Sequence, residues 1–495
     1  MTPRLTAVAC TLALASGVLA ACSDDDPAPS GDGSVESRWW GPGKGASTAG
    51  DPSDPEGAAA AASEPREDSV YPEAGDPSVD ALHYDLTLDW DPDTDTLTGE
   101  EVLRFRSTAT AGRFQLDFSE PMTVETATLD GEDVEFEESG KDLVVTADVA
   151  EDQEYELVLT YAGKPGPVPV PTKRGDFSGT GFTVTDTHET WTMQEPFGAF
   201  TWYAVNDQPA DKALYDFTLS VPSPWVGVAN GELESRTDED GTTTTHWSLA
   251  EPAASYLTTL AFGDFEMTED ESQSGTPITY WVNRSAEPGI LESLKTTPAA
   301  MAWLEDKLGP YPFDTFGTLV VDSESGMETQ TMVTLGNTEY TTSEAVIVHE
   351  LAHQWYGDTV TPNDWRDVWM NEGMAMYLQG MWEAEDSGRS IDEQMEEWSF
   401  TESYEREFAG PPAAYDREAF GSGNIYYGPA LMWHELRQKI GDEKFFAMIR
   451  AWPEERTNTS TGRDDYFAWL EEQTGEELSS FLDDWLLGKK TPPRD

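Results

Sequence analysis

The chain has few cysteines and few cations, and each shortage excludes a class of protein. Two cysteines, Cys10 and Cys22, occur in 495 residues. Cys10 lies in an N-terminal stretch that we expect to be removed, so no pair remains to form a disulfide. Lysine and arginine number 29 against 95 acidic residues, and they form no basic cluster. Because neutralising phosphates requires clustered cations, nucleic acid is excluded as a partner.

Long apolar runs are missing after the first 21 residues, so no transmembrane helix is expected there. Residues 1–21 contain an early cation, Arg4, and then an apolar stretch that ends in small residues, which is typical of an export signal. The sequence L-A-A-C at 19–22 resembles the bacterial lipobox, in which the signal is cut before the cysteine and the thiol then carries lipid. The alternative is an ordinary signal peptide that contains a cysteine. We expect an exported protein, anchored by lipid on Cys22 to the extracellular face of the cell membrane.

Residues 22–79 differ in composition from the rest of the chain. They are rich in aspartate, proline, glycine, alanine, serine and glutamate, and large apolar residues are scarce. Such a segment buries too little apolar surface to fold, so the sequence predicts a disordered acidic tether. The formal net charge of −66 would keep the protein body away from anionic headgroups.

The spacing of apolar residues divides the rest of the chain into two parts. Apolar and polar residues alternate in segments such as 84–90, which is typical of half-buried antiparallel strands. We therefore expect residues 80–265 to form one β domain, a sandwich or saddle. Beyond it the spacing is mostly helical, as in residues 301–308. The predicted fold class is α+β and multidomain, with a mainly helical domain over residues 266–495.

Two of the six histidines stand four residues apart in the sequence V-I-V-H-E-L-A-H-Q-W-Y-G. On a helix, His349 and His353 share one face about 6 Å apart along the axis, so both imidazoles can bind one metal ion. Gly357 is suited to end that helix, and Glu350 can take a proton from the metal's water.

A third ligand follows in the sequence W-M-N-E-G. Eighteen residues separate His353 from Glu372, which lies on a second predicted helix. Three protein ligands leave one position of a tetrahedral metal open, which marks a catalytic zinc site and not a structural one. An isolated H-E-x-x-H arises by chance, but N-E-G at this distance favours the metal site.

With these motifs the chain resembles the aminopeptidase N family of zinc peptidases, which also includes leukotriene hydrolases. The resemblance covers most of residues 80–495, and W-Y-A-V-N-D at 202–207 is similar to short actinobacterial members. It implies a thermolysin-like catalytic domain with one Zn²⁺ per chain. It also implies that the substrates are peptides with a free N-terminus, from which the N-terminal residue is removed.

The resemblance further implies which residues bind substrate. The family's G-x-M-E-N segment corresponds to S-G-M-E-T at 325–329, where serine and threonine replace the flanking glycine and asparagine. Gly326 and Met327 would line the substrate site. Glu328 would hold the α-ammonium group, assisted by Glu195 in T-M-Q-E-P-F-G. For both glutamates the alternative is surface charge, which is plausible in so acidic a chain.

In this family a tyrosine hydroxyl at the start of a later helix stabilises the oxyanion. Here N-I-Y-Y-G-P-A, residues 424–430, precedes a helical pattern, and Pro429 suits a first helical turn. The alignment points to Tyr426, with Tyr427 directly behind it, and either is alternatively a packing aromatic.

Two other functions are compatible with parts of the pattern. A zinc-bearing surface lipoprotein could bind peptides without cutting them, but it would be expected to have lost the base or a ligand, and neither is lost. An endopeptidase or an epoxide hydrolase on the same scaffold would accommodate the altered segment at 325–329. An aminopeptidase is distinguished from these because it rejects a blocked amino terminus.

Overall fold

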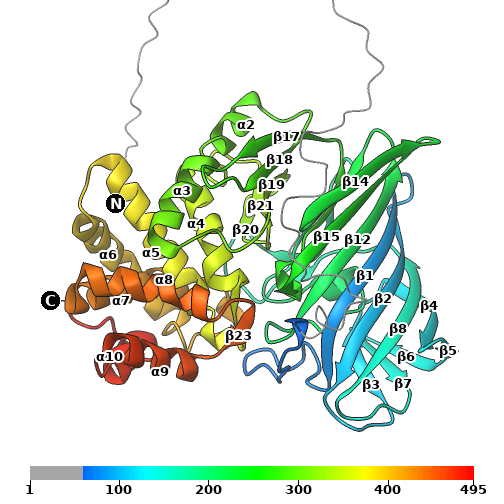
Figure 1. Cartoon of the computed structure of the whole chain (residues 1–495), viewed down its shortest axis with the longest axis horizontal. Helices are drawn as coiled ribbons and strands as arrows, with labels where there is room; N and C mark the ends of the chain where they lie inside the picture. The colour runs from blue at the N-terminus through cyan, green and yellow to red at the C-terminus, as the bar shows by residue number, and fades with distance from the viewer. Residues whose placement is uncertain (1–59, 495) are drawn as a thin grey trace, which may run out of the picture. The chain divides into compact units, whose positions relative to one another are not determined.

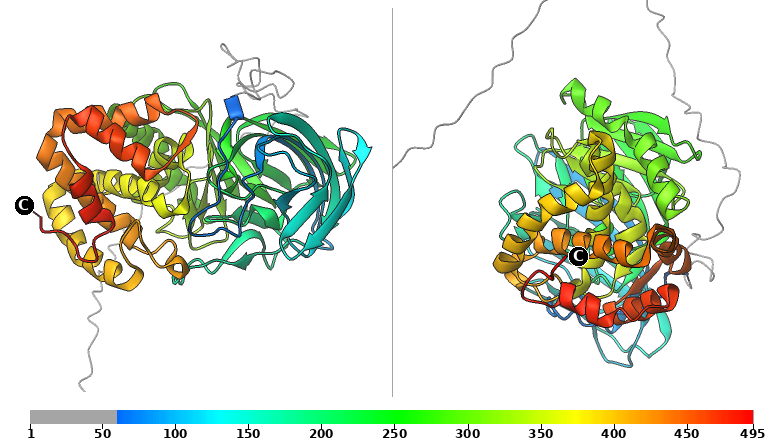
Figure 2. Two further views of the ribbon diagram at one scale, coloured as in Figure 1. Left: turned by 90° about the horizontal axis from the view of Figure 1, so that it is seen from below. Right: turned by 90° about the vertical axis from the view of Figure 1, so that its left-hand side faces the viewer.

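The computed structural model describes residues 60–494, which form a β-rich domain followed by a domain that contains most of the helices (Figures 1 and 2). The predicted fold class is thus confirmed. Within residues 60–494, the helices are all too short or too polar to span a bilayer. The predicted export signal, the lipobox with Cys22, and the tether up to residue 59 lie outside the described residues.

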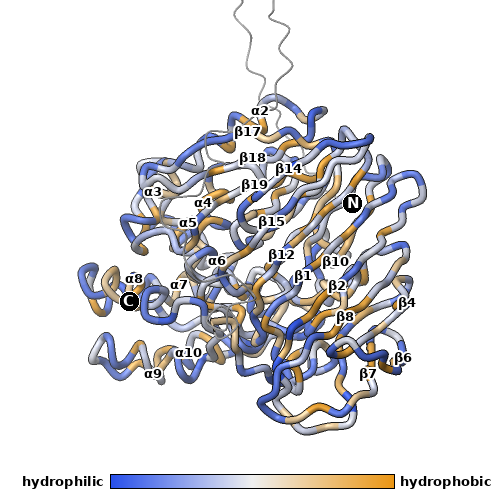
Figure 3. Tube along the Cα trace, turned by 45° about the vertical axis from the view of Figure 1, so that its right-hand side comes forward, coloured by the Kyte–Doolittle hydropathy of each residue, from blue (hydrophilic) through white to orange (hydrophobic). Residues whose placement is uncertain are grey.

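The β-rich domain is a sandwich whose larger sheet has eight strands in the order β14-β15-β12-β1-β2-β8-β4-β5. These strands are β1 (Val79–Asp91), β2 (Thr96–Ser107), β4 (Met122–Leu129), β5 (Glu132–Asp133), β8 (Gln153–Gly163), β12 (Lys212–Pro222), β14 (Glu232–Glu239) and β15 (Thr242–Ala254). Over much of β1, β2 and β8, buried residues alternate with more exposed ones, and most of the buried ones are apolar. Figure 3 shows hydrophobic and hydrophilic colours alternating along these strands. The alternation therefore reflects one face turned to a core.

A second sheet covers this apolar face. Its order is β13-β16-β11-β10-β9, with β9 (Val168–Pro169), β10 (Gly179–Val184), β11 (Thr190–Met193), β13 (Val226–Ala229) and β16 (Leu260–Gly263). Trp90 of β1 packs against Phe182 and Phe262 of the second sheet, with ring centroids 5.5 and 6.4 Å apart. A smaller sheet contains β3 (Phe114–Asp117), β7 (Asp142–Thr146) and β6 (Glu135–Ser139).

The second domain begins with a five-stranded sheet in the order β17-β18-β19-β21-β20. Its strands are β17 (Phe265–Glu271), β18 (Pro277–Asn283), β19 (Phe316–Val321), β20 (Gly326–Met327) and β21 (Met332–Gly336). Strands β19, β20 and β21 lie in a region where mostly helices were expected. All six residues of β19 and all five of β21 are buried. Because no exposed polar residues alternate with buried ones, these strands show no strand periodicity in the sequence.

Helices make up most of the rest. They are α2 (Pro288–Leu294), α3 (Thr297–Leu308), α4 (Glu344–His353), α5 (Trp369–Ser387), α6 (Ile391–Ala409), α7 (Asn424–Ile440), α8 (Asp442–Glu455), α9 (Arg463–Thr474) and α10 (Ser479–Leu486). A short parallel pair, β22 (Val360–Pro362) with β23 (Thr459–Thr461), lies among them. Helix α5 packs against both α4 and α7, and these three helices carry the predicted metal and oxyanion residues.

The prediction of a disordered tether through residue 79 is wrong for its last part, because residues 60–78 are packed against the domains. Asp68 is 2% exposed, and its carboxylate accepts a hydrogen bond from the Trp365 N–H at 2.6 Å. Ser69 donates to Asp364 from its backbone and its hydroxyl, and Tyr71 is fully buried. Composition did not reveal this order, because it depends on polar contacts with residues nearly 300 positions away.

Buried polar contacts also join the two domains. Lys212, at the start of β12, donates to the Asp358 carbonyl oxygen at 2.6 Å. The Tyr256 hydroxyl donates to the Gly357 carbonyl oxygen at 3.2 Å. Both acceptors lie just beyond α4, so the β-rich domain holds the end of the helix that carries the histidines.

Candidate metal centre and active-site cleft

Helix α4 presents the two histidines. It begins with Glu344, whose charge suits a helix N-terminus, and its apolar residues are buried. The helix ends at His353, four residues before the predicted end at Gly357, and a π-type turn at Gln354–Asp358 follows. Gly357 has φ +136°, and a Cβ there would lie 3.1 Å from Nδ2 of Asn371. The glycine is therefore required by the turn and not by the helix end itself.

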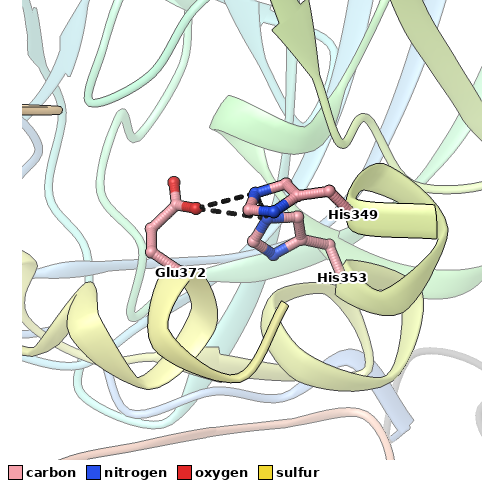
Figure 4. A group of neighbouring side chains, drawn as sticks. All are labelled: His349, His353 and Glu372. Atoms are coloured by element: carbon pink, nitrogen blue, oxygen red, sulfur yellow. Dashed lines mark hydrogen bonds and ion pairs between the residues drawn. The ribbon is translucent and has the colours of Figure 1, made fainter. Parts of the chain in front are cut away.

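The predicted ligands converge at one point (Figure 4). Nε2 of His349 lies 3.1 Å from Nε2 of His353, and Oε2 of Glu372 lies 3.2 and 3.3 Å from these two nitrogens. A tetrahedral zinc with bonds of about 2.0–2.1 Å holds its ligand atoms about 3.3–3.4 Å apart. The three ligand atoms therefore already have the spacing that one such ion requires.

The histidines are also oriented as ligands. Nδ1 of His353 lies 3.1 Å from the Tyr356 carbonyl oxygen and must donate to it, so Nε2 carries the lone pair that faces the other ligands. His353 and His349 are 1% and 8% exposed. Burial lowers the pKa of His349, which favours the neutral imidazole that binds metals.

Helix α5 supplies Glu372 from its first turn. The next residue, Gly373, lies where α7 crosses: a Cβ there would be only 2.2 Å from Cβ of Pro429. Glycine in the N-E-G sequence thus lets α7 approach the ligand. Pro429 itself is inside α7 and not in its first turn, since the helix begins at Asn424. The first turn instead contains Tyr426.

Glu350 lies on α4 beside the ligands and is 8% exposed. Burial raises its pKa to about 8. Its carboxylate lies so close to β20 that a Cβ at Gly326 would be 2.7 Å from Oε1. The predicted substrate-site glycine therefore leaves room for the predicted base. Met327, the next residue, is 4% exposed and lines the same cleft.

Glu328 and Glu195 reach the cleft from different domains. Glu328 lies in the turn between β20 and β21, and Glu195 follows β11 of the β-rich domain. With a carboxylate oxygen of Glu372, their oxygens all lie within 4.8 Å of one another. Burial and the neighbouring charges of Glu328 and Glu372 raise the pKa of Glu195 well above its ordinary value. These two glutamates are not surface charges.

One oxygen of each glutamate lacks a protein partner. Oε1 of Glu195 and Oε1 of Glu328 are buried and accept no hydrogen bond from any residue between 60 and 494. Leaving a buried carboxylate oxygen unpaired costs free energy. The pair is therefore suited to a cation that carries several N–H donors.

The substituted residue after Glu328 keeps the turn in place. The Thr329 hydroxyl donates to the Met332 carbonyl oxygen and lies 3.1 Å from Oγ1 of Thr334. Gln354, the residue after His353, donates from Nε2 to the Glu328 carbonyl oxygen at 3.2 Å. The turn that carries Glu328 is thus tied directly to the metal-binding helix.

The two tyrosines have different environments. The Tyr426 ring lies 5.9 Å from the His349 ring, and the charges that act on its hydroxyl include those of Glu372, Glu195 and Glu328. The Tyr427 ring instead packs edge-on against Trp398 at 5.5 Å. Both tyrosines line the cleft, and Tyr426 is the one whose ring lies beside a predicted metal ligand.

These residues line a cleft of about 640 Å³, which also contains a residue that the sequence did not reveal. Arg174, in the loop between β9 and β10, has Nη1 3.5 Å from the Tyr426 hydroxyl. The adjacent cations Lys173 and Arg174 stand out in so acidic a sequence. The local sequence gives no sign, however, that they lie near α7.

Comparison with known proteins agrees with this geometry. The model of the peptidase family M1 domain matches residues 292–485, and that of the peptidase M1 N-terminal domain matches residues 80–257. Aminopeptidase N of Streptomyces lividans is 25% identical over 448 residues, which cover 83% of this chain and 50% of that protein. Aminopeptidase N of Lactococcus lactis is 25% identical over 57% of this chain and 36% of its own length. The chain thus spans about half the length of these relatives, or less.

A solved structure is similar along nearly its whole length. It is an M1 zinc metallopeptidase mutant from Deinococcus radiodurans bound to a Tyr-Ser-Ala substrate. The TM-score is 0.78 with 26% identity, covering 86% of this chain and 98% of that one. Both domains and the ligand motif are accounted for by one family, and this chain belongs to peptidase family M1.

Proposed function

We propose that this protein is a zinc-dependent aminopeptidase that removes N-terminal residues from peptides. The observation that carries the proposal is the pair Glu195 and Glu328, whose buried oxygens face the same cleft as the metal triad. A free α-ammonium supplies the charge and the N–H donors that this pair lacks. It would fix the peptide so that its first peptide bond lies at the triad.

The donor set of His349, His353 and Glu372 fits Zn²⁺, which when bound there polarises a carbonyl group and lowers the pKa of a water molecule. Glu350 accepts a proton from the attacking water and passes it to the departing amine. The Tyr426 hydroxyl donates a hydrogen bond to the oxygen on which negative charge develops. Glu195 and Glu328 hold the ammonium group in register throughout.

The relatives support the same activity. Two are named aminopeptidase N, and the M1 metallopeptidase mutant was solved with a tripeptide in place. A non-catalytic peptide-binding protein is disfavoured, because the base and all three ligands are present and brought together. An endopeptidase would gain nothing from two buried carboxylates beside the triad.

The ammonium site is tested with Glu328→Gln and Glu195→Gln, assayed on aminoacyl arylamides. Each variant should raise KM at least about tenfold, since a charge-assisted bond is lost. Glu324→Gln, which removes a carboxylate from the rim of the same cleft, is the control and should change KM little. If both site variants retained the wild-type KM, the exopeptidase assignment would fail.

We further propose that the protein is exported and held at the membrane by lipid on Cys22. The support is the apolar N-terminal stretch that ends in L-A-A-C. Expression of the full chain in a bacterial host with an alkyne fatty acid should label the wild type and leave it in the membrane fraction. Cys22→Ala should be unlabelled. Wild-type protein without label, found in the medium, would favour the ordinary signal peptide.

A further inference from the structure

The cleft is strongly acidic except at one place. Eight carboxyl side chains line it against two cations, Lys173 and Arg174. A peptide's own carboxylate would be repelled by such a lining. The exception is the loop between β9 and β10, where both cations lie.

This loop is fixed to the helical domain. Oγ1 of Thr172 donates to the Phe420 carbonyl oxygen at 2.6 Å, and the Phe420 N–H donates to the Pro171 carbonyl oxygen at 3.0 Å. Lys173 is engaged elsewhere, because its ammonium group pairs with Asp416 at 2.8 Å and lies over the Phe408 ring. Of the two cations, Arg174 is the one directed at the reaction site.

The Arg174 guanidinium makes close hydrogen bonds to Asp176 and only long contacts to the residues at the reaction site. Asp176 accepts hydrogen bonds from Nε at 3.2 Å and from Nη2 at 2.5 Å. Nη1 lies 3.5 Å from the Tyr426 hydroxyl, and Nη2 lies 3.4 Å from Oγ of Ser325. These two long contacts are easily exchanged for a stronger acceptor, while Asp176 keeps the fork in place.

We propose that Arg174 binds the α-carboxylate of a dipeptide, which makes the enzyme prefer dipeptides with a free carboxyl terminus. The inference rests on the proposed function, because Glu195 and Glu328 must hold the other end of the substrate. With the scissile carbonyl beside Tyr426, the next carbonyl carbon of an extended chain lies about 3.3–3.6 Å further on. In a dipeptide that carbon belongs to the carboxylate, which is within reach of a guanidinium adjacent to the Tyr426 hydroxyl.

The test compares three substrates with the same N-terminal residue: a dipeptide, its C-terminal amide, and an aminoacyl arylamide. For the wild type, KM should be lower for the dipeptide than for its amide. Arg174→Gln should raise KM for the dipeptide about ten- to a hundredfold, as expected for loss of one charge-assisted hydrogen bond. KM for the amide and the arylamide should change by less than about threefold. Arg174→Lys should restore part of the preference.

Lys173→Gln is the matched control, since it removes one positive charge from the same loop without removing a donor near Tyr426. It should leave the preference for the dipeptide in place. An equal loss of preference in this variant would mean that general charge, and not Arg174, attracts the carboxylate.

Other outcomes separate the possible failures. If Arg174→Gln lowered kcat equally for all three substrates, the guanidinium would act through Tyr426 and the proposal would be wrong. A wild type that cleaved the dipeptide and its amide with equal KM would also overturn it, while leaving the aminopeptidase assignment intact. Failure to cleave even the arylamide would instead contradict the proposed function.

Discussion

At the scale of single residues, the buried carboxylates of the site differ in whether they have a cationic partner. Glu372 lies between two imidazoles, and although burial opposes ionisation, the histidines lower its pKa. Burial and the surrounding carboxylates raise the pKa of Glu195. Burial and the charge of Glu372 raise the pKa of Glu328. The cleft therefore holds more carboxylates than its own side chains can neutralise. A metal ion and an ammonium group together correct that imbalance.

Glu350→Gln should abolish turnover and leave the metal in place. The amide cannot accept a proton, and loss of general-base catalysis lowers kcat by about 10²–10⁴-fold. The three ligands are untouched, so bound zinc should stay near one per chain by elemental analysis of the purified protein. Substantial activity in this variant would show that another group takes the proton.

The two adjacent tyrosines provide a matched pair. Tyr426→Phe should lower kcat by about 10²–10³-fold, the loss typical of removing one oxyanion donor. Tyr427→Phe should lower kcat only slightly, because its ring packs against Trp398, whereas the Tyr426 ring lies beside His349. Steady-state kinetics on one arylamide measures both. The reverse ranking would mean that the alignment is displaced by one residue.

At the scale of elements, the sequence predicted best what depends on local spacing. His349, Glu350 and His353 lie on a single helix, where their spacing alone puts the two imidazoles on one face. Glu372 lies in the first turn of the next long helix, and it meets the histidines because α5 packs against α4. The strands β19 and β21 were missed, because every residue in them is buried and no apolar–polar alternation marks them as strands.

Two further misses have a tertiary origin. The order of residues 60–78 depends on acceptors such as Asp364, far along the chain. The position of Arg174 depends on a loop of one domain that is anchored on the other. Neither contact has a signal in the local sequence, since both exist only once the two domains are assembled.

Truncation tests whether residues 60–78 belong to the folded unit. A chain beginning at residue 60 should keep the contacts of Asp68 and Tyr71, whereas a chain beginning at residue 79 loses them and leaves the Trp365 N–H without its acceptor. The shorter chain should lose at least about 3 kcal/mol of unfolding free energy, since a fully buried aromatic and several buried hydrogen bonds are removed. Urea unfolding measures the difference. Equal midpoints would support the tether prediction through residue 79.

At the scale of the whole molecule, the excess of acid makes stability depend on pH. Glu251 is an example, because burial and the neighbouring Asp314 raise its pKa to about 7. Between about pH 4.3 and pH 7 the folded state holds a proton that the unfolded chain has released. The free energy of unfolding therefore falls as the pH rises through this window.

Glu251→Gln should flatten that dependence. The variant should gain up to about 3 kcal/mol over the wild type at pH 8 and little at pH 4.5, as measured by urea unfolding. Glu234→Gln, at an exposed position on β14, removes the same charge and is the control. If the free energy of unfolding changed by the same amount from pH 5 to pH 8 in the wild type and in both variants, this account would be contradicted.

The central claim is that one metal and one ammonium site act on the same substrate. The most direct measurement is release of a fluorescent amine from aminoacyl amides by the purified folded domains, with and without a chelator, beside the same substrates acetylated at the amino terminus. The account predicts cleavage of the free substrates only, its loss with chelator, and its return with zinc. Cleavage of the acetylated substrates at a similar rate would contradict the roles of Glu195 and Glu328, and cleavage that survives metal removal would contradict the metal centre.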